Sequence, residues 1–189
     1  MIPERITTDR LILRRFTRRD TDAVFSAIEG SLPQLSEFLP WAHAAYARED
    51  AAGYIRESMT AWKEGRAFDF AIRLRSHPSH HIGNISIWHV SRLARTGEIG
   101  YWVRSDQSGR GIATEATAAM VEKGFVNLGL HKVTLRIAQG NRGSERVAEK
   151  LGFTREGVLR EELRINGVWV DHTLYSMLEH ELARRPAAT

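Results

Sequence analysis

The sequence contains no cysteine. Disulfide bridges, thiolate metal ligands and a cysteine-linked covalent intermediate are therefore excluded. Long hydrophobic runs are absent as well, since no apolar stretch approaches the roughly 20 residues that span a bilayer. Residues 1–5 lead into a charged segment rather than into the apolar core of a secretory signal. We therefore expect a soluble, cytoplasmic protein that does not associate with a membrane.

Blocks of like charge and linker-like segments are also missing. The 27 Lys and Arg residues exceed the 23 Asp and Glu residues, which gives a net charge of +4, but the arginines fall in scattered pairs such as Arg14-Arg15, Arg18-Arg19 and Arg184-Arg185. This pattern favours a solvated surface over a nucleic-acid-binding face, so nucleic acid is not the expected partner. Because no Pro-, Gly- or Ser-rich stretch divides the 189 residues, we expect a single domain over residues 1–189.

Signals for metal or hydrolase chemistry are weak. His77, His80 and His81 fall together, but they lie in a proline-containing segment without an adjacent carboxylate, which indicates surface rather than a metal site. The HExxH pattern of zinc peptidases and the GxSxG pattern of serine hydrolases are both missing. We expect no metal.

Hydrophobic periodicity divides the chain into strands and helices. Alternating or short apolar runs predict strands at residues 11–16, 68–75, 82–90, 98–103, 132–137, 158–165 and 168–177, with another strand opening at Phe153. Helical spacing and capping residues predict helices from Asp20, within 32–43, at 48–64, from Gly111 to Gly129 and from Asn141 to Leu151. Residues 76–81 are predicted to be one hairpin loop, and Asn166-Gly167 the turn of another. The order predicts a mixed α/β fold with a mostly antiparallel sheet flanked by helices.

A turn with two glycines joins the strand that ends at Val103 to the next helix. The unpaired N–H groups and the dipole of a helix N-terminus attract phosphate, and Gly109 and Gly111 permit close backbone approach. Arg110 adds a positive charge. The dinucleotide fingerprint is excluded, because Thr114 stands where it needs a third glycine, and the Gly-Lys-Ser/Thr ending of a P-loop is missing. The residues alone leave a phosphate site and a plain strand-to-helix turn both open.

The segment Ser108-Gly109-Arg110-Gly111-Ile112-Ala113 resembles the Gln/Arg-x-x-Gly-x-Gly/Ala motif of the GNAT family of N-acetyltransferases. Four further segments occur in family order, and they are Gly100-Tyr101-Trp102-Val103, Ala113-Thr114-Glu115-Ala116, Asn141-x-x-Ser144 and Leu151-Gly152-Phe153-x-x-Glu156-Gly157. Together they cover most of the chain and resemble the RimJ/RimL branch, the ribosomal-protein N-terminal acetyltransferases and their relatives. The resemblance implies the GNAT fold.

The resemblance also implies acetyl-coenzyme A (acetyl-CoA) as co-substrate, with backbone amides of the turn around its pyrophosphate. The residues expected at the cofactor are Trp102, Val103, Ser108, Gly109, Arg110, Gly111, Ile112, Ala113, Thr114, Asn141 and Ser144. Ser108 departs from the motif, which usually has Gln or Arg at this position. One side-chain contact with the phosphates is therefore expected to be lost.

An amine attacks a thioester only when neutral, so near pH 7 the reaction needs a base or a water chain to one. Glu98 resembles in position the strand-borne glutamate base of some family members, although a solvated strand-edge residue is the alternative. Many members use a tyrosine as acid where this chain has Ala148. Ser144 is the nearest matching hydroxyl for protonating the thiolate, with water as the alternative, and backbone N–H groups near Trp102 to Arg104 are implied at the oxyanion.

The resemblance implies an amine acceptor and leaves its identity open. A protein N-terminal α-amine, as in the ribosomal-protein alanine enzymes, is the leading hypothesis, and a small-molecule amine such as an amino acid, polyamine or antibiotic is the alternative. A non-catalytic CoA-binding or nucleic-acid-binding module is a third. Acceptor-side candidates are Phe38, Trp41 and Asp171 by resemblance. Tyr46, Trp62, Trp88 and Trp169 are aromatic candidates that could instead be core, and Tyr54 and His172 carry the same ambiguity. The sequence leaves monomer and homodimer both open.

Overall fold

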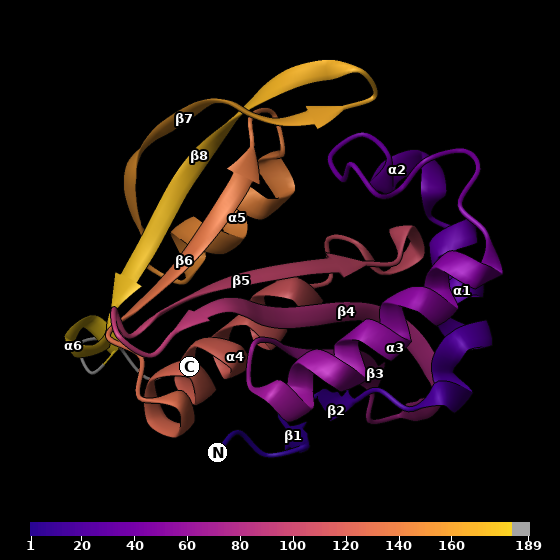
Figure 1. The fold of residues 1–189 in the computed structure, drawn as a ribbon, viewed down its shortest axis with the longest axis horizontal. Helices are drawn as coiled ribbons and strands as arrows, with labels where there is room; N and C mark the ends of the chain where they lie inside the picture. Colours follow the sequence, from indigo (N-terminus) through magenta and orange to yellow (C-terminus); the bar gives the residue numbers. More distant parts are fainter. Residues whose placement is uncertain (183–189) are drawn as a thin grey trace.

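The computed structural model describes residues 1–182, so residues 183–189, including the Arg184-Arg185 pair, lie outside the described part. Eight strands form one sheet in the order β1-β2-β3-β4-β5-β6-β8-β7, flanked by helices (Figure 1). The strands are β1 (Arg5–Thr7), β2 (Leu11–Arg15), β3 (Phe68–Leu74), β4 (His77–Ser91), β5 (Thr96–Val103), β6 (Lys132–Ala138), β7 (Thr154–Ile165) and β8 (Val168–Leu178). The helices are α1 (Thr21–Glu29), α2 (Leu32–Leu35), α3 (Arg48–Glu64), α4 (Ile112–Leu128), α5 (Arg142–Lys150) and α6 (Glu179–Leu182), with short 3₁₀ helices η1 (Arg18–Asp20) and η2 (Ser105–Gln107). The predicted mixed α/β fold with a mostly antiparallel sheet is confirmed.

Local sequence signals placed several boundaries correctly. Helix α3 spans the predicted residues 48–64 and ends at Gly65, whose φ of 68° is the left-handed conformation that glycine adopts readily. Asn166 and Gly167 both have positive φ, as a two-residue hairpin turn requires. Asp20 stands at the N-cap position of α1 as predicted, but its side chain does not cap that helix. Its carboxylate accepts hydrogen bonds from Thr17 and two arginines instead.

The predicted loop at residues 76–81 is wrong, because β4 already begins at His77. The Arg73 guanidinium donates to the carbonyl oxygens of Pro78 (2.8 Å) and Ser79 (2.6 Å), which holds this stretch beside β3. Strand β5 pairs with β4 only from Gly83 onward. Pro78 therefore lies where β4 is bonded on one side, a position that tolerates a missing backbone N–H.

Two hydrophobic clusters pack the faces of the sheet. On one face, Ile85, Ile87 and Ile99 contact apolar residues of α4 such as Met120. On the other, Ala71 and Trp102 pack with residues of α1 and the first half of α3. Alternate residues of β4 and β5 thus serve opposite faces, which is the period of two that the sequence showed.

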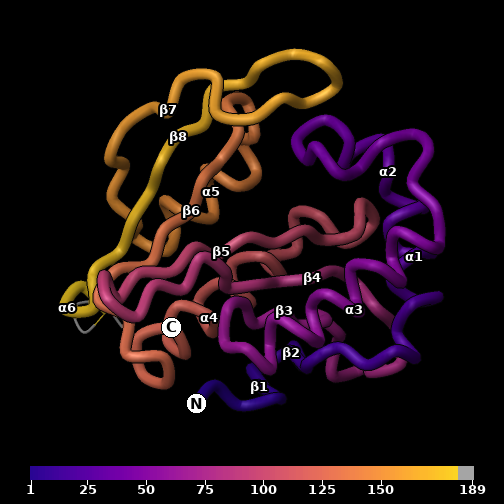
Figure 2. Tube along the Cα trace, viewed as in Figure 1, coloured from indigo at the N-terminus to yellow at the C-terminus, as the bar shows by residue number. Residues whose placement is uncertain are grey.

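The strands β5 and β6 form the parallel pair of the sheet and separate after three residues. Their register joins Thr96 to Lys132, Gly97 to Val133 and Glu98 to Thr134, and it ends there. Beyond that point β5 stays with β4 while β6 stays with β8, so the two strands diverge like the arms of a V (Figure 2). The opening leaves backbone groups on both arms available to a ligand.

A buried ion-pair cluster joins β2, β3 and η1. The Asp20 side chain, 3% exposed, accepts hydrogen bonds from Arg14, from Arg73 at 2.9 Å and from the Thr17 backbone N–H at 2.8 Å. Burial alone raises the pKa of the Asp20 carboxyl, but Arg14 and Thr17 outweigh that effect and lower the pKa to about 2. The cluster therefore stabilises the ionised form of the carboxyl.

Replacing Asp20 with Asn is expected to destabilise the fold by about 3 kcal/mol, because Arg73 loses its buried counterion. The folded-state pKa lies below the ordinary aspartate value of 3.8, so the carboxylate contributes fully above about pH 4 and its contribution disappears as the pH falls to about 2. Wild-type protein should lose about 2 kcal/mol of unfolding free energy across that window, and Asp20→Asn should lose less. Urea unfolding at several pH values measures both, and identical acid profiles would contradict the assignment.

Candidate active site

The turn before α4 has the geometry of an anion site. Gly109 and Gly111 adopt φ of 76° and 75°, and Gly111 is the N-cap of α4. No side chain caps this helix N-terminus, so its first N–H groups and the positive end of the helix dipole remain for a ligand. A Cβ built at Gly109 would meet no atom within 4 Å. The glycine is therefore required there by the backbone conformation rather than by space.

Residues from the β1–β2 turn hold the glycine turn in place. Glu115 of α4 accepts hydrogen bonds from the Thr8 hydroxyl (2.5 Å) and the Arg10 backbone N–H (2.9 Å), and it forms an ion pair with the Arg10 side chain at 2.6 Å. Arg10 also donates to the carbonyl oxygen of Arg110 (2.9 Å). The sequence carried no signal for these contacts, which join residues about a hundred positions apart.

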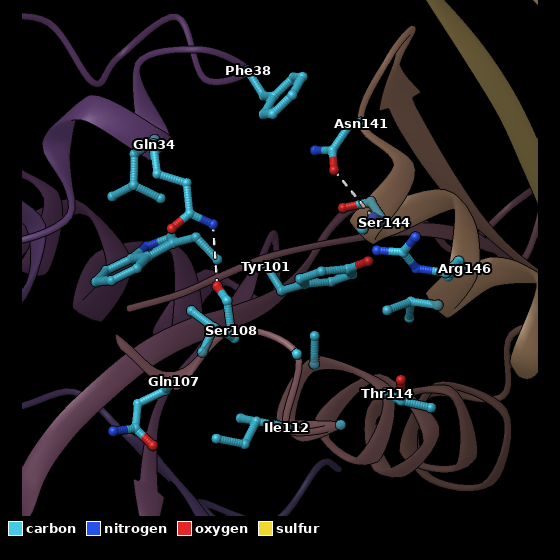
Figure 3. A pocket seen from close by; sticks show the side chains of 18 of the residues that line it. Gln34, Phe38, Tyr101, Gln107, Ser108, Ile112, Thr114, Asn141, Ser144 and Arg146 are labelled. Atoms are coloured by element: carbon cyan, nitrogen blue, oxygen red, sulfur yellow. Dashed lines mark hydrogen bonds between the residues drawn. The ribbon is translucent and has the colours of Figure 1, made fainter. Parts of the chain in front are cut away.

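A side-chain amide does reach the turn, from another part of the chain. Gln34 of α2 donates from Nε2 to the Ser108 hydroxyl at 3.1 Å (Figure 3). The motif has an amide or guanidinium at the position of Ser108, and here α2 brings an amide beside it. Sequence reasoning missed Gln34 because it lies 74 residues from its partner.

A cavity of about 460 Å³ opens above the turn, between α2, α4 and α5. It brings together every residue predicted at the cofactor except Arg110, whose carbonyl is bound by Arg10 on the outside of the turn. Arg146 and Lys150 of α5 also line it. The two cations and the helix N-terminus fit a polyanionic ligand.

A second cavity of about 690 Å³ lies on the side of the sheet that faces α1 and α3. The two cavities share the following residues of β5, α5 and the α2 region: Phe38, Leu39, Tyr101, Trp102, Asn141 and Ser144. They therefore meet at the opening between β5 and β6, where a donor from one side could reach an acceptor from the other.

Most acceptor-side candidates line the second cavity. Those that line it are Phe38, Trp41, Tyr46 and Trp88, together with His172. Trp62 instead packs edge-on against Phe68 and Phe70 in the core, and Trp169 is 57% exposed. Asp171 accepts a hydrogen bond from the Glu161 backbone N–H (2.8 Å) and does not line the cavity.

Glu98 lines the second cavity at the vertex where β5 and β6 separate. Its side chain is 12% exposed and forms an ion pair with Arg136 Nε at 2.8 Å, so it is not a solvated edge residue. Arg136 also pairs with Glu162 of β7. Burial alone lowers the pKa of Arg136, but the two glutamates outweigh it and raise that pKa. Arg136 thus holds the Glu98 carboxylate in a defined position.

Two hydroxyl groups lie at the junction of the cavities. Asn141 caps α5 by accepting a hydrogen bond from the Ser144 backbone N–H (3.1 Å), which confirms the predicted cap. The Tyr101 ring points from β5 toward this helix start (Figure 3). Its buried hydroxyl has no hydrogen-bond partner of good geometry within residues 1–182, and burial raises its pKa to about 12 against the opposing effect of the Ser144 hydroxyl. Ala148 is fully buried and offers no proton.

One of the backbone donors implied for an oxyanion is already engaged. The Arg104 N–H donates to the Ile82 carbonyl oxygen at 2.9 Å. Trp102 and Val103 line the cavity at the opening. Because Trp102 pairs with Asn84, two residues before the Arg104 bond, its N–H also faces β4, which leaves the Val103 N–H for the oxyanion.

The described part of the chain shows no helix long and apolar enough to cross a membrane. Among residues 1–182, no three His, Asp or Glu side chains are grouped as metal ligands would be. His77 and His80 stack on one another with ring centroids 5.8 Å apart, while His81 is buried and packs near Trp102.

The uncapped helix N-terminus, the diverging strands and the two cavities that meet there fit an enzyme that transfers a group between two substrates. Comparison with known proteins identifies the protein family. A model of the acetyltransferase (GNAT) domain matches residues 10–154, and the chain belongs to this family of N-acetyltransferases.

Individual relatives agree with this assignment. The chain is 30% identical over 176 residues to the uncharacterized N-acetyltransferase YnaD of Bacillus subtilis, covering 93% of this chain and 98% of YnaD. It is 41% identical over 98 residues to the probable N-acetyltransferase YjcK of the same species, which is 51% of this chain and about half (54%) of YjcK. The ribosomal-protein-serine acetyltransferase of Escherichia coli is 27% identical over 144 residues, 76% of this chain and 79% of that protein.

Among solved structures, Mycobacterium smegmatis RimJ in complex with CoA-disulfide superimposes with a TM-score of 0.83. The two chains are 27% identical, and the match covers 91% of this chain and 83% of RimJ.

Proposed function

We propose that this protein transfers the acetyl group of acetyl-CoA directly to the α-amine of a protein N-terminus. The observation that carries the proposal is the meeting of the two cavities at the opening between β5 and β6. The similarity to a ribosomal-protein-serine acetyltransferase and to a CoA-bound RimJ supports both the donor and the acceptor.

The first cavity suits the phosphates of acetyl-CoA. Their negative charge would meet the N–H groups after Gly111, with Arg146 and Lys150 on the facing wall. Gln34 and Ser108 would flank the same phosphates. The thioester would then lie toward Tyr101 and Ser144, at the junction with the second cavity, which would hold the acceptor and is called the acceptor cavity below.

In the proposed reaction Glu98 removes a proton from the acceptor ammonium, directly or through water. The neutral nitrogen attacks the thioester carbonyl carbon, and the Val103 backbone N–H at the opening stabilises the oxyanion. The C–S bond then breaks, and the thiolate takes the proton of the Ser144 hydroxyl. The proton that the nitrogen loses as the amide forms replaces it on Ser144, directly or through water. Tyr101 provides a second hydroxyl at the same junction, and the raised pKa keeps it protonated.

Removing one hydroxyl should lower kcat by about tenfold or less, and removing both should lower it further. Ser144→Ala is expected to lower kcat less than about tenfold because the Tyr101 hydroxyl remains, and Tyr101→Phe by about tenfold. The double variant should lose about 10²-fold, the lower range of proton-transfer effects. Thiol release measured against pH, with thermal unfolding as a control for structure, tests this. Full activity of the double variant at every pH would show that water supplies the proton.

A small-molecule amine is the second candidate, and one contact favours a slender acceptor of this kind over a folded protein surface. Asn166 in the β7–β8 turn donates to the Ser36 carbonyl oxygen just after α2 (2.8 Å), which ties the hairpin to the α2 segment beside the acceptor cavity. A closed rim admits a slender acceptor more readily than a folded protein surface. An extended N-terminus and a small amine both satisfy that limit.

A panel of acceptors separates the two candidates. It contains short peptides with a free α-amine, the same peptides with a blocked α-amine and a free lysine, and small amines. Mass spectrometry should find the acetyl group on the free α-amine and none on the blocked peptides. If only the small amines are acetylated, the acceptor is a small molecule, and the proposed acetyl transfer still holds.

A further inference from the structure

The second cavity contains a buried carboxylate that has no cation beside it. Asp69 of β3 is 6% exposed and lines the cavity. Its Oδ1 accepts hydrogen bonds from the Ser86 hydroxyl and from the Tyr54 hydroxyl (3.3 Å), but Asp69 forms no ion pair within the described residues. Hydroxyl donors compensate a buried carboxylate only in part, and a cation from a ligand would stabilise it further.

The other buried aspartate of the described residues, Asp20, has its charge compensated by cations. Asp20 has both Arg14 and Arg73 within ion-pair distance. Asp69 has hydroxyl donors only, and it faces a cavity rather than the core. This difference points to a cation that comes from outside the protein.

The surroundings of Asp69 suit a cationic group. Asn84 lines the same cavity, is 3% exposed, and its Oδ1 has no hydrogen-bond partner within residues 1–182. The cavity is lined by four carboxylates and one arginine. Arg136 pairs with Glu98, and the other three carboxylates, those of Glu49, Asp50 and Asp69, form no ion pair within residues 1–182. Aromatic rings such as Trp41 and Trp88 form much of the rest, and their faces also attract cations. The cavity is thus acidic within a chain of net charge +4.

The strand register shows how far Asp69 lies from the vertex where β5 and β6 separate. Asp69 pairs with Ser86, and Ser86 pairs with Gly100, whereas Glu98 pairs with Trp88. A Cβ at Gly100 would lie 2.1 Å from the Trp88 ring, so that ring crosses diagonally over Gly100. It therefore stands between Glu98 and the Ser86–Asp69 pair. Adjacent strands are about 5 Å apart, so Asp69 on β3 lies two strand spacings, roughly 10 Å, from β5 at the edge of the opening.

We infer that the acceptor carries a positive charge in addition to the amine that is acetylated, and that Asp69, with Ser86 and Asn84, binds it. This inference rests on the proposed function. The second charge is an ammonium or guanidinium group several bonds from the attacking nitrogen. A basic side chain near a protein N-terminus and the far end of a diamine both supply it.

Two matched pairs of acceptors test the inference. Cadaverine and pentylamine differ by the second ammonium, and alanine-initiated peptides with lysine or norleucine at the second position differ in the same way. Wild-type protein should show a KM about tenfold or more lower for the charged member of at least one pair, because a charge-assisted contact is gained. Which pair shows the larger difference identifies the source of the charge.

Asp69→Asn removes the charge and retains Oδ1 as an acceptor for Ser86 and Tyr54. This variant should raise the KM of the charged member to that of its neutral partner, with the kcat of both little changed. Glu57→Gln on the outer surface of α3 is the matched control, since it removes the same charge and leaves Arg66 paired with Glu64. It should retain the wild-type preference.

Equal KM values within both pairs for the wild type would overturn the inference, as would an equal rise for charged and neutral acceptors in Asp69→Asn. Acetylation of any of these amines would still uphold the proposed acetyl transfer. No thiol release with any amine would instead overturn the proposed function, and the inference with it.

Discussion

Replacing Gly111 with valine is expected to weaken acetyl-CoA binding by about 10²-fold or more. Gly111 has a φ of 75°, which a β-branched residue adopts only with strain, and its new Cβ would approach Arg10 Nη2 to 3.3 Å. Relieving either the backbone strain or the close contact with Arg10 would move the N–H groups that begin α4. Thermal unfolding measures the loss, because a ligand at 100 times its Kd stabilises wild-type protein by about 2.7 kcal/mol.

Gly129→Val is the matched control for Gly111→Val. Gly129 ends the same helix with a φ of 65°, so valine meets similar backbone strain there but far from the turn. Both variants should be less stable without ligand, and only Gly129→Val should be stabilised by acetyl-CoA as the wild type is. Equal stabilisation of all three proteins would mean that the turn does not hold the donor.

Glu98→Gln is expected to lower kcat by about 10²-fold with little change in acetyl-CoA binding, because the glutamine cannot accept the proton of the attacking amine. The deficit should shrink as the pH approaches the pKa of the amine, where more of the acceptor is already neutral. Arg136 keeps Glu162 as a partner in this variant, so its position should be preserved. A pH–rate profile for wild type and variant measures the effect.

Glu162→Gln separates proton transfer from positioning. Glu162 contacts the same guanidinium but is not among the residues that line the acceptor cavity. Its substitution should lower kcat less than that of Glu98 and leave the shape of the pH profile unchanged. A larger loss in Glu162→Gln than in Glu98→Gln would move the role of base to Glu162.

Features determined by neighbouring residues were predictable from the sequence. The span of α3 follows from its apolar spacing and from Gly65, and the β7–β8 turn follows from Asn166-Gly167. The glycine turn before α4 is similarly local. The error at residues 76–81 arose because Pro78 is normally a loop residue, and the partner that extends the strand, Arg73, acts through its side chain.

The parts of the site that escaped prediction depend on contacts between distant segments. Nothing near Ser108 indicates that Gln34 will reach it, and the Glu98–Arg136–Glu162 ion pairs join three strands. Tyr101 was visible within a motif, but its role depends on where the cavities meet. The divergence of β5 from β6 likewise depends on the partners of each strand, and no residue in β5 alone marks it.

The most direct test of the account is a reaction in which thiol release from acetyl-CoA and acetylation of a peptide α-amine are followed together. Direct transfer at the junction of the two cavities predicts one thiol for each acetylated amine, with both rates lowered equally in Glu98→Gln. Thiol release without an acetylated amine, or no release with any amine tested, would contradict it.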